Sequence, residues 1–528
     1  FDWFESDSVD GRWQETDVGD WLACLVGLPG GTVRKGMTVR AGDDRQATVC
    51  YDTEFCKLRG AWTGGFLKFN PARYGLIGTP QPDGEPVFFL PEGPGWGNDA
   101  QIQYRGLYAG DGRVVLEYEV DGVLIRESPW AEGSEAGDIV IRTIQIAPAD
   151  HSLVLNALAG AEGELTTIAA DGHPTFHVKR EATDWFAAAV ADPGVVQAHE
   201  SEDSDVTGAF EIAGHTETVS IHLVYWSVAD DTDQTLEEVL NAVEWAQFDE
   251  GWMQPGNPRW TDDITTQGLR SEADAAYVVD TITIPFDNPY RALFFVGGHD
   301  FFSDGRVALC TAHGDVWTVS GVDNDLEELT WRRYATGLFQ PLGLKIIDDA
   351  VYVLGRDQIT VLHDRNDDGE ADHYECFSNL HFTSAGGHDY VACLETDSEG
   401  NFWFVHATQG VVKVAADGQS LESVATGLRN PNGMGLGPGD VVTAAPQEGE
   451  WTPASGIFVV QPGAHFGFRG PQVTDDRPLG YDEPIAWIPR REDNSSGGQV
   501  WATNPEWGPL AGKMLHLSYG QCRPLLVL

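Results

Sequence analysis

The sequence predicts a mainly β protein, with a β-sandwich-like domain first and a β-propeller after it. Three observations support this fold class. The chain of 528 residues contains 61 glycines and 18 tryptophans but few stretches with the period of a long helix. Short alternating runs separated by Asp-Gly turns fill its first half. Two segments of its second half recur about 90 residues later, as expected for stacked four-stranded blades.

Residues 1–250 are predicted to form the sandwich-like domain, whose function the local chemistry does not reveal. The run 107–118 has the pattern strand, Gly-Asp-Gly turn, strand, which indicates a hairpin. Aromatic residues on the glycine-rich segments 61–66 and 91–97 fit either stacking on sugar rings or anchoring of these loops on their own sheet. Residues 251–275 are polar and aperiodic and contain proline, so we expect them to be the inter-domain linker.

Residues 276–528 are predicted to form the propeller. The segment 297–301 matches 386–390, which lies 89 residues on, and 335–343 matches 425–433, which lies 90 residues on. A period near 90 corresponds to two four-stranded blades of about 45 residues each. This spacing leaves room for about five blades of a six-bladed propeller. Because the chain stops within a strand-like run, we expect the natural protein to continue beyond it.

The charge of the chain restricts its partners and its setting. Its 82 acidic residues against 32 lysines and arginines leave a formal net charge of -50. Such an excess argues against nucleic acid or an anionic membrane surface as the main partner. It predicts a halophilic, secreted protein with an extracellular or periplasmic location. No window resembles a membrane span, and the seven cysteines form neither CxxC nor CxxCH, so no zinc site or covalent haem is encoded.

Residues 364–375 have the pattern of a calcium-binding loop between two strand-like flanks. Oxygen donors fall at positions 1, 3, 5, 9 and 12, and glycine falls at position 6, where the turn requires it. Position 7 offers its backbone carbonyl. The alternative is an acidic turn in an acidic protein, while the calcium hypothesis implies a structural clip. The predicted ligands are Asp364, Asn366, Asp368, Glu370, Asp372 and Glu375.

Residues 427–468 are predicted to hold the ligand site. Arg429, Asn430 and Asn432 lie on a turn that proline and glycine shape, and a glycine-rich strand and a Gln/Glu/Trp loop follow. Polar groups on rigid turns at strand ends are what a pocket in an all-β scaffold requires. The earlier copy of the turn has phenylalanine and glutamine where this one has Arg429 and Asn430, so the prediction concerns these two side chains above all.

The stretch 427–468 resembles the glucose/sorbosone dehydrogenase propellers. The quinoprotein members of that family carry a G-x-R-N-P-x-G turn, a glycine-rich loop and a G-x-x-[YF]-G-[WF] close. The whole chain is also similar to a family of large secreted proteins of planctomycetes and related bacteria. These proteins pair an N-terminal β domain of unknown function with a propeller named as a membrane-bound dehydrogenase, often followed by a c-type haem domain. This second resemblance includes residues 61–66, 285–288, 331–357 and 493–499.

The resemblance implies an oxidoreductase of sugars or related alcohols and aldehydes, with pyrroloquinoline quinone (PQQ) and calcium as cofactors. His388 falls where those quinoproteins have the base, and Arg429, Asn430 and Asn432 fall on the turn that holds the quinone. This sequence departs from the family at 447–451, where the calcium loop of the quinoproteins is rewritten. The Gly-Gly-His-Asp context of His388 also occurs at 297–300, so a packing role for that motif stays open.

Two functions from different classes therefore stay open. The first is a secreted, quinoprotein-like oxidoreductase with a carbohydrate or another small molecule as substrate and a c-type haem domain or protein as electron acceptor. The second is a non-catalytic, calcium-binding, carbohydrate-binding or cell-surface scaffold protein, because propellers often serve as interaction platforms. A polysaccharide-cleaving enzyme built on the first domain is a weaker third, since no carboxylate pair there is convincing.

Overall fold

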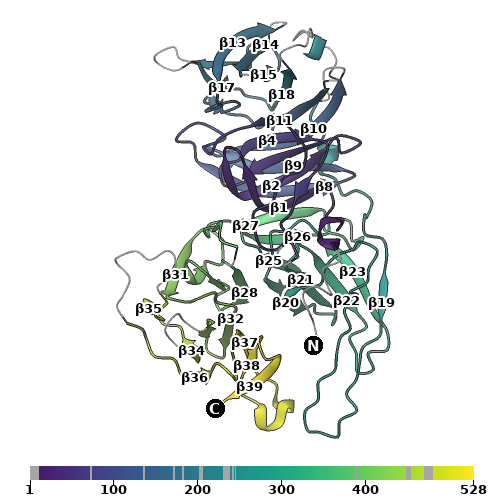
Figure 1. The fold of residues 1–528 in the computed structure, drawn as a ribbon, viewed down its shortest axis with the longest axis vertical. Helices are drawn as coiled ribbons and strands as arrows, with labels where there is room; N and C mark the ends of the chain where they lie inside the picture. The colour runs from purple at the N-terminus through teal and green to yellow at the C-terminus, as the bar shows by residue number, and fades with distance from the viewer. Residues whose placement is uncertain are drawn as a thin grey trace. The chain divides into compact units, whose positions relative to one another are not determined.

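The computed structural model describes residues 11–528 apart from 72–73, 135–136, 171–172, 181–182, 201–205, 230–237, 241–242, 244, 246, 388, 448–453 and 469–479. The chain divides into two compact units. Unit 1 comprises residues 1–17, 260–362 and 377–528, and unit 2 comprises 18–259 and 363–376. Nearly all of the regular structure in both units is β-strand, as the sequence predicts (Figure 1).

The described part of unit 2 contains two large antiparallel sheets and two small ones. The first large sheet has the order β1-β2-β3-β4-β7, and the second has the order β13-β14-β15-β18-β11-β10-β9-β8, with β27 beside β8. The small sheets are β12-β17-β16 and β5-β6. The elements are β1 (Trp21–Leu28), β2 (Gly31–Ala41), β3 (Ala47–Asp52), β4 (Lys57–Thr63), β5 (Leu67–Lys68), β6 (Gln81–Pro82), β7 (Glu85–Phe89), β8 (Ile102–Gly110), β9 (Arg113–Val120), β10 (Val123–Ser134), β11 (Gly137–Ile146), β12 (Leu153–Leu155), β13 (Glu164–Ala170), β14 (His173–Lys179), β15 (Thr183–Val190), β16 (Val196–Glu200), β17 (Val206–Ile212), β18 (Val219–Ala229), the 3-10 helix η2 (Glu250–Met253) and β27 (His373–Ser378).

The hairpins that the sequence predicts in unit 2 are present, and their turns have the expected conformation. Asp111 and Gly112, between β8 and β9, have φ values of 45° and 78°. Asp121 and Gly122, between β9 and β10, have φ values of 51° and 79°. Two successive left-handed residues are typical of the tight turn whose twist matches that of the flanking strands. The Asp-Gly pairs therefore determine where these strands reverse.

A buried ion pair lies in the core of unit 2. Arg142 on β11 donates from Nε and Nη2 to the two carboxylate oxygens of Glu127 on β10, at 2.7 and 2.9 Å. The hydroxyls of Tyr51 and Tyr118 donate to the same carboxylate, and Arg142 Nη1 donates to the hydroxyl of Tyr225 at 3.1 Å. All five residues are at most 1% exposed. Burial alone would raise the pKa of Glu127, but the guanidinium and the hydrogen bonds hold it below its usual value.

Unit 1 has the blade-after-blade arrangement of a propeller. Its described sheets have the orders β19-β23-β22-β21-β20, β24-β25-β26, β28-β29-β30-β31 with β35 parallel to β31, β32-β33-β34-β36, and β37-β38-β39. The elements are η1 (Arg12–Gln14), β19 (Ile264–Thr266), β20 (Val296–Phe301), β21 (Val307–Thr311), β22 (Val316–Ser320), β23 (Leu329–Ala335), β24 (Gly343–Ile347), β25 (Ala350–Leu354), β26 (Ile359–His363), β28 (Val391–Thr396), β29 (Phe402–His406), β30 (Gly410–Val414), β31 (Leu421–Thr426), β32 (Gly433–Gly437), β33 (Val441–Ala445), β34 (Ala454–Val459), β35 (Ala464–His465), β36 (Ala486–Pro489), β37 (Ser496–Trp501), η3 (Pro505–Leu510), β38 (Met514–Ser518) and β39 (Arg523–Val527).

The first strands of successive blades pack against one another, from β20 through β24, β28 and β32 to β37. Glycines allow the backbones of these strands to approach one another closely. A Cβ atom on Gly433 of β32 would lie 1.8 Å from the carbonyl oxygen of Gly497 on β37, and one on Gly298 of β20 would lie 2.7 Å from the backbone nitrogen of Leu344 on β24. The first copy of Gly-Gly-His-Asp therefore has the packing role that its repetition suggested.

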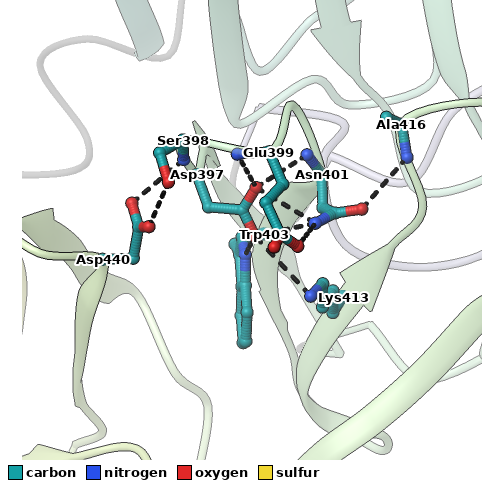
Figure 2. A network of polar contacts seen from close by, with 8 residues as sticks. All are labelled: Asp397, Ser398, Glu399, Asn401, Trp403, Lys413, Ala416 and Asp440. Atoms are coloured by element: carbon teal, nitrogen blue, oxygen red, sulfur yellow. Dashed lines mark hydrogen bonds and ion pairs between the residues drawn. The ribbon is translucent and has the colours of Figure 1, made fainter.

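Polar contacts between hairpin turns also join neighbouring blades, and they recur with the repeat. The backbone N–H of Ser398, in the β28–β29 turn, donates to Asp440 in the β32–β33 turn at 3.0 Å, and its hydroxyl donates to the same carboxylate (Figure 2). The N–H of Ser303, in the β20–β21 turn, donates to Asp349 in the β24–β25 turn at 2.7 Å. Asp397, beside Ser398, accepts hydrogen bonds from within its own hairpin. Asp349 and Asp440 thus join neighbouring blades, whereas Asp397 stabilises its own hairpin.

A second buried polar network lies in the last blade and is centred on Asp493. Ser496 and Ser518 each donate to its carboxylate at 2.7 Å, and His516 Nε2 lies 2.8 Å from it. Gln499 Nε2 donates to His516 Nδ1 at 3.1 Å, so the imidazole carries its proton on Nε2. Burial would raise the pKa of Asp493, but the donors from His516, Ser496 and Ser518 lower it to about 2.

The segment predicted to be a linker, 251–275, contributes regular structure to both units. Three of the four residues of η2 belong to this segment and lie in unit 2, and β19 pairs with β23 in unit 1. The division between the units falls between Arg259 and Trp260. The segment 363–376, far along the sequence, belongs to unit 2 by its contacts. Within the described ranges no helix is long and apolar enough to cross a membrane.

Candidate functional site

The predicted ligand turn in unit 1 has the same backbone as its earlier copy. Gly427 and Gly337 have φ values of 81° and 84°, and Asn430 and Gln340 have φ values of 37° and 41°. Asn430 thus occupies a left-handed turn position, which asparagine tolerates better than most residues. The same conformation occurs in both copies, so Asn430 has a role in shaping the turn whether or not its amide binds a ligand.

The structure shows a second pair of equivalent residues in the two copies of the repeat, Arg356 and Gln447. The backbone N–H of Arg356 donates to the carbonyl of Phe339 at 2.9 Å, and the N–H of Gln447 donates to the carbonyl of Arg429 at 3.1 Å. Phe339 and Arg429 are equivalent in the repeat, so Arg356 and Gln447 are equivalent as well. Each follows the second strand of its blade, β25 or β33.

The side chains of this second pair link their blades to the segment that precedes a neighbouring inner strand. Arg356 Nη2 donates to the carbonyl oxygens of Ser384 and Gly386 at 2.8 and 2.9 Å, just before β28. Gln447 Nε2 donates to the hydroxyl of Ser495 at 3.1 Å, just before β37. The guanidinium of Arg356 therefore joins two blades in the first copy. In the second copy, the uncharged amide of Gln447 joins the corresponding blades.

Arg429 and Gln447 line a small recess, as the sequence predicted for Arg429. Four aromatic side chains complete its wall, and a volume of about 20 Å³ gives room for one or two water molecules. Arg429 is half-buried. The described lining residues are Gly427, Arg429, Pro446, Gln447, Ala454, Gly456, Phe458, Phe466, Phe468 and Trp487.

The aromatic wall extends from the core to the surface. The rings of Phe458 and Phe466 lie 4.4 Å apart, and both side chains are buried. Trp487 stands edge-on to Phe458, with ring centroids 6.3 Å apart, and is 44% exposed. Tyr481 lies 6.1 Å from Trp487 and is 42% exposed. An apolar ring face is thus available to a ligand beside the recess.

The other predicted residues are not brought to this recess by the described structure. His388, the predicted base, lies outside the described residues. Asn432 is half-buried, and its backbone carbonyl accepts a weak hydrogen bond from the thiol of Cys393 at 3.9 Å. Of the three residues predicted to hold a quinone, Arg429 lines the recess and Asn430 and Asn432 are not among its described lining residues.

The recess, as its described residues form it, does not fit PQQ. Sites for drug-sized ligands have volumes of roughly 300–1,000 Å³, more than ten times the space found here. A guanidinium suits the carboxylates of the quinone, but the described residues leave no space for three fused rings. We therefore assign no reaction step to this cofactor.

The predicted calcium loop lies between β26 and β27. The carboxylate of Asp364 accepts the backbone N–H groups of Asp368 and Gly369 at 3.1 and 2.8 Å, and the amide of Asn366 donates to Asp368 at 2.8 Å. Positions 1, 3 and 5 are thus drawn together around a tight turn. Burial raises the pKa of Asp364, and the nearby carboxylates of Asp368 and Asp367 raise it further.

The last two predicted calcium ligands have other partners. Asp372 pairs with Arg365, and Glu375 Oε2 lies 2.8 Å from His363 Nε2. The side chain of Glu370, whose carbonyl was predicted as a ligand, accepts the backbone N–H of Arg259 at 2.6 Å. Within the described part of the chain, no three His, Cys, Asp or Glu side chains are placed to hold a metal. The loop fits calcium at its first three positions and not at its last two.

Arg356 was not predicted from the sequence, and Gln447 was noted only as part of the rewritten loop 447–451. The signal was present, because the repeat continues past the turn, where the offset between equivalent residues grows from 90 to 91. Alignment of β25 with β33 would have matched the two positions, but not what their side chains contact.

Comparison with known proteins finds a family match for part of unit 2. A family model described as a domain of unknown function, DUF6797, matches residues 49–127, which extend from β3 into β10. No curated protein matches the chain. The family match includes Tyr51, Tyr118 and Glu127 of the buried network but assigns them no activity.

Solved structures similar to this chain include proteins that act on sugars. The PQQ-bound aldose sugar dehydrogenase of Streptomyces coelicolor is 11% identical, and the match covers 45% of this chain and 82% of that one with a TM-score of 0.31. The pyranose dehydrogenase PQQ domain of Coprinopsis cinerea is 8% identical, with coverages of 43% and 71% and a TM-score of 0.32. A calcium structure of the Trichoderma reesei Carbohydrate-Active Enzymes family AA12 is 11% identical, with coverages of 44% and 76% and a TM-score of 0.31. At these values the likeness does not bear on the activity of this chain.

Proposed function

We propose that the protein binds a sugar-like alcohol or aldehyde at the Arg429 recess and acts on it as an oxidoreductase. The observation that supports this proposal best is the joint presence of a guanidinium, an amide and an exposed aromatic ring at one recess. Arg429 and Gln447 offer hydrogen-bond donors to hydroxyl or carbonyl oxygens, and Trp487 offers a flat apolar face to a sugar ring. A rigid turn between blades holds the first of these groups in place.

Sugar-dependent dye reduction tests the oxidoreductase. The protein, as purified and after incubation with PQQ and calcium, is mixed with an artificial electron acceptor, whose reduction is followed over a panel of neutral and acidic sugars. We expect reduction with at least one sugar and a kcat/KM at least about tenfold lower in Arg429→Gln, because charge-assisted hydrogen bonds contribute about 1.5–3 kcal/mol. Arg306→Gln, an exposed arginine of unit 1, is the matched control. If no sugar of the panel were turned over, the proposed oxidoreductase activity would be contradicted.

The second candidate is non-catalytic carbohydrate binding. The volume of the recess favours it, since a small recess with two polar side chains beside an exposed tryptophan suits the recognition of one sugar substituent and does not require a bound cofactor. Sugar binding without dye reduction, lost in Arg429→Gln, would select this function over the first.

We also propose that calcium binds the 364–375 loop and stabilises unit 2. The grouping of Asp364, Asn366 and Asp368 around one tight turn supports this, because oxygen donors at these three positions are calcium ligands in loops of this spacing. Calcium is expected to raise the thermal midpoint of unit 2 by a few degrees, since a ligand that binds only the folded state stabilises it. Asp364→Asn should abolish the response, whereas Asp99→Asn, an exposed change elsewhere in unit 2, should keep it. A midpoint of the wild type that ignores both calcium and chelator would show that the loop is an acidic turn.

A further inference from the structure

We propose that the outer face of the last blade pairs with the same face of a second copy of this chain. The face consists of five side chains on β37, β38 and β39: Val500, Leu515, Leu517, Pro524 and Leu526. Val500 is paired with Leu515, and Leu515 with Leu526, while Leu517 is paired with Pro524. Paired residues of neighbouring strands lie on the same side of a sheet, as do residues two apart on one strand, so the five side chains form one surface.

The opposite, inner face of the same sheet is covered by the preceding blade. Met514, which is 7% exposed, belongs to one buried cluster with Ala445 and Ile457 of that blade, and both of these are 0% exposed. Trp501 and Val527, which flank Met514 in the register, pack against the same cluster. In this unit, an apolar sheet face is therefore covered by the face of another sheet.

The outer face is apolar as well, but it is largely open to solvent. Val500 is 51% exposed, Leu517 is 45% exposed and Leu526 is 43% exposed. Contiguous exposed apolar side chains on a folded protein mark a site of interaction. Because burial of apolar surface is favourable in proportion to its area, a second sheet that covers these strands would stabilise the pair.

The charge of the protein favours a second copy as the occupant of this face. With a net charge of -50, two copies repel each other over most of their surface. In a two-fold interface, a residue near the axis meets the same residue of the other copy, so a charged group there would face its own like charge. None of the five residues of the outer face is charged. A basic partner would instead be bound through some of the 82 acidic residues, and this face offers none of them.

An exposed loop adds apolar surface beside the last blade. Within residues 269–281, Tyr277 stacks on Trp507 of η3, with ring centroids 6.1 Å apart, and its hydroxyl donates to the backbone carbonyl of Trp507 at 2.6 Å. The next two residues, Val278 and Val279, are 48% and 80% exposed. Because η3 links β37 to β38, the loop lies next to the blade. Three strands of about five residues span roughly 14 by 17 Å, which is less than the ~800 Å² that each partner contributes to a stable complex. We therefore expect this loop to take part in the interface.

Sedimentation equilibrium of the 528-residue chain tests the proposal. We expect a monomer–dimer equilibrium with a dissociation constant in the micromolar range, as is typical of a small interface. Raising sodium chloride from about 0.15 M to about 1 M should lower this constant at least about threefold, because salt screens the repulsion between the two copies. A dimer that salt weakens would be held by opposite charges, which would contradict the apolar interface.

A charged substitution on the outer face should break the dimer. Leu517→Glu places two like charges near the two-fold axis, so we expect the dissociation constant to rise at least about a hundredfold. Since Leu517 is 45% exposed, the variant should fold with a thermal midpoint within a few degrees of the wild type. Ile168→Glu makes the same change at an apolar residue of unit 2 that is 36% exposed, and it should leave the dissociation constant unchanged.

Hydroxyl-radical footprinting locates the interface independently of mass. Labelling of Leu517 and Leu526 should fall as the protein concentration rises through the dissociation constant, while labelling of Ile168 should stay constant. A chain that stays monomeric at every concentration and salt would overturn the proposal. A dimer that Leu517→Glu leaves intact would show that two copies pair elsewhere. Low labelling of the outer face in a monomer would show that the chain covers this face itself, which would also overturn the proposal.

Discussion

Glu127→Ala is expected to lower the free energy of unfolding of unit 2 by about 3–5 kcal/mol. The substitution leaves the guanidinium of Arg142, which is 1% exposed, without its carboxylate, and an uncompensated buried charge costs energy on that scale. The hydroxyls of Tyr51 and Tyr118 also lose their acceptor. Because a chain with two units need not unfold in one step, the measurement is hydrogen–deuterium exchange in increasing urea, read separately for peptides of each unit.

The matched control removes both charges. Glu127→Leu with Arg142→Met leaves no unpaired ion in the core, and such replacements are often neutral or stabilising. We therefore expect the double variant to recover most of the loss seen with Glu127→Ala. Peptides of unit 1 should report no change in either variant. If Glu127→Ala destabilised unit 2 by less than about 1 kcal/mol, the buried pair would contribute little to its stability.

Asp493→Ala is expected to destabilise unit 1 by about 3 kcal/mol. Ser496, Ser518 and His516 all donate to this carboxylate, and its removal leaves three buried donors without an acceptor. Each unsatisfied buried donor costs about 1–3 kcal/mol, reduced where neighbours rearrange. Urea unfolding read from unit 1 peptides measures the loss. Asp274→Ala, an exposed change in the same unit, should stay within about 0.5 kcal/mol of the wild type.

The same carboxylate should make unit 1 sensitive to acid. The folded pKa of Asp493 is about 2, below its value in an unfolded chain of about 3.9. A pKa that is lower in the folded state means that the carboxylate stabilises the fold above about pH 4 and that this stabilisation is lost as the pH falls towards 2. Between pH 5 and pH 2 the wild type should therefore lose about 2 kcal/mol more than Asp493→Asn. Equal losses in the two proteins would contradict the assignment.

Local patterns in the sequence predicted much of the fold. Asp111-Gly112 and Asp121-Gly122 mark two hairpin turns, because few other residue pairs adopt successive left-handed conformations. The repeat of 335–343 at 425–433 identified equivalent turns in two blades. The expected extracellular or periplasmic location and the c-type haem partner stay predictions.

The candidate site was predictable only in part. Arg429 was predicted because it replaces the phenylalanine of the earlier copy of the turn, and in the structure it lines the recess. The sequence did not show that Asn430 and its equivalent Gln340 both occupy a left-handed turn position. Nor did it show that Gln447 makes a link between blades like the one that Arg356 makes. The predicted calcium ligands were chosen by spacing, but Asp372 and Glu375 are paired with Arg365 and His363.

The sequence by itself determined the class of fold, the positions of tight turns and the position of the arginine that departs from the repeat. These properties depend on residues close together in the chain, whose backbone preferences and spacing can be read directly. Only the tertiary structure decided which groups meet. Glu127 and Tyr51 are 76 residues apart, and Gln447 and Ser495 are 48 apart. Partners at such separations are selected by the packing of whole sheets, and no local pattern records them.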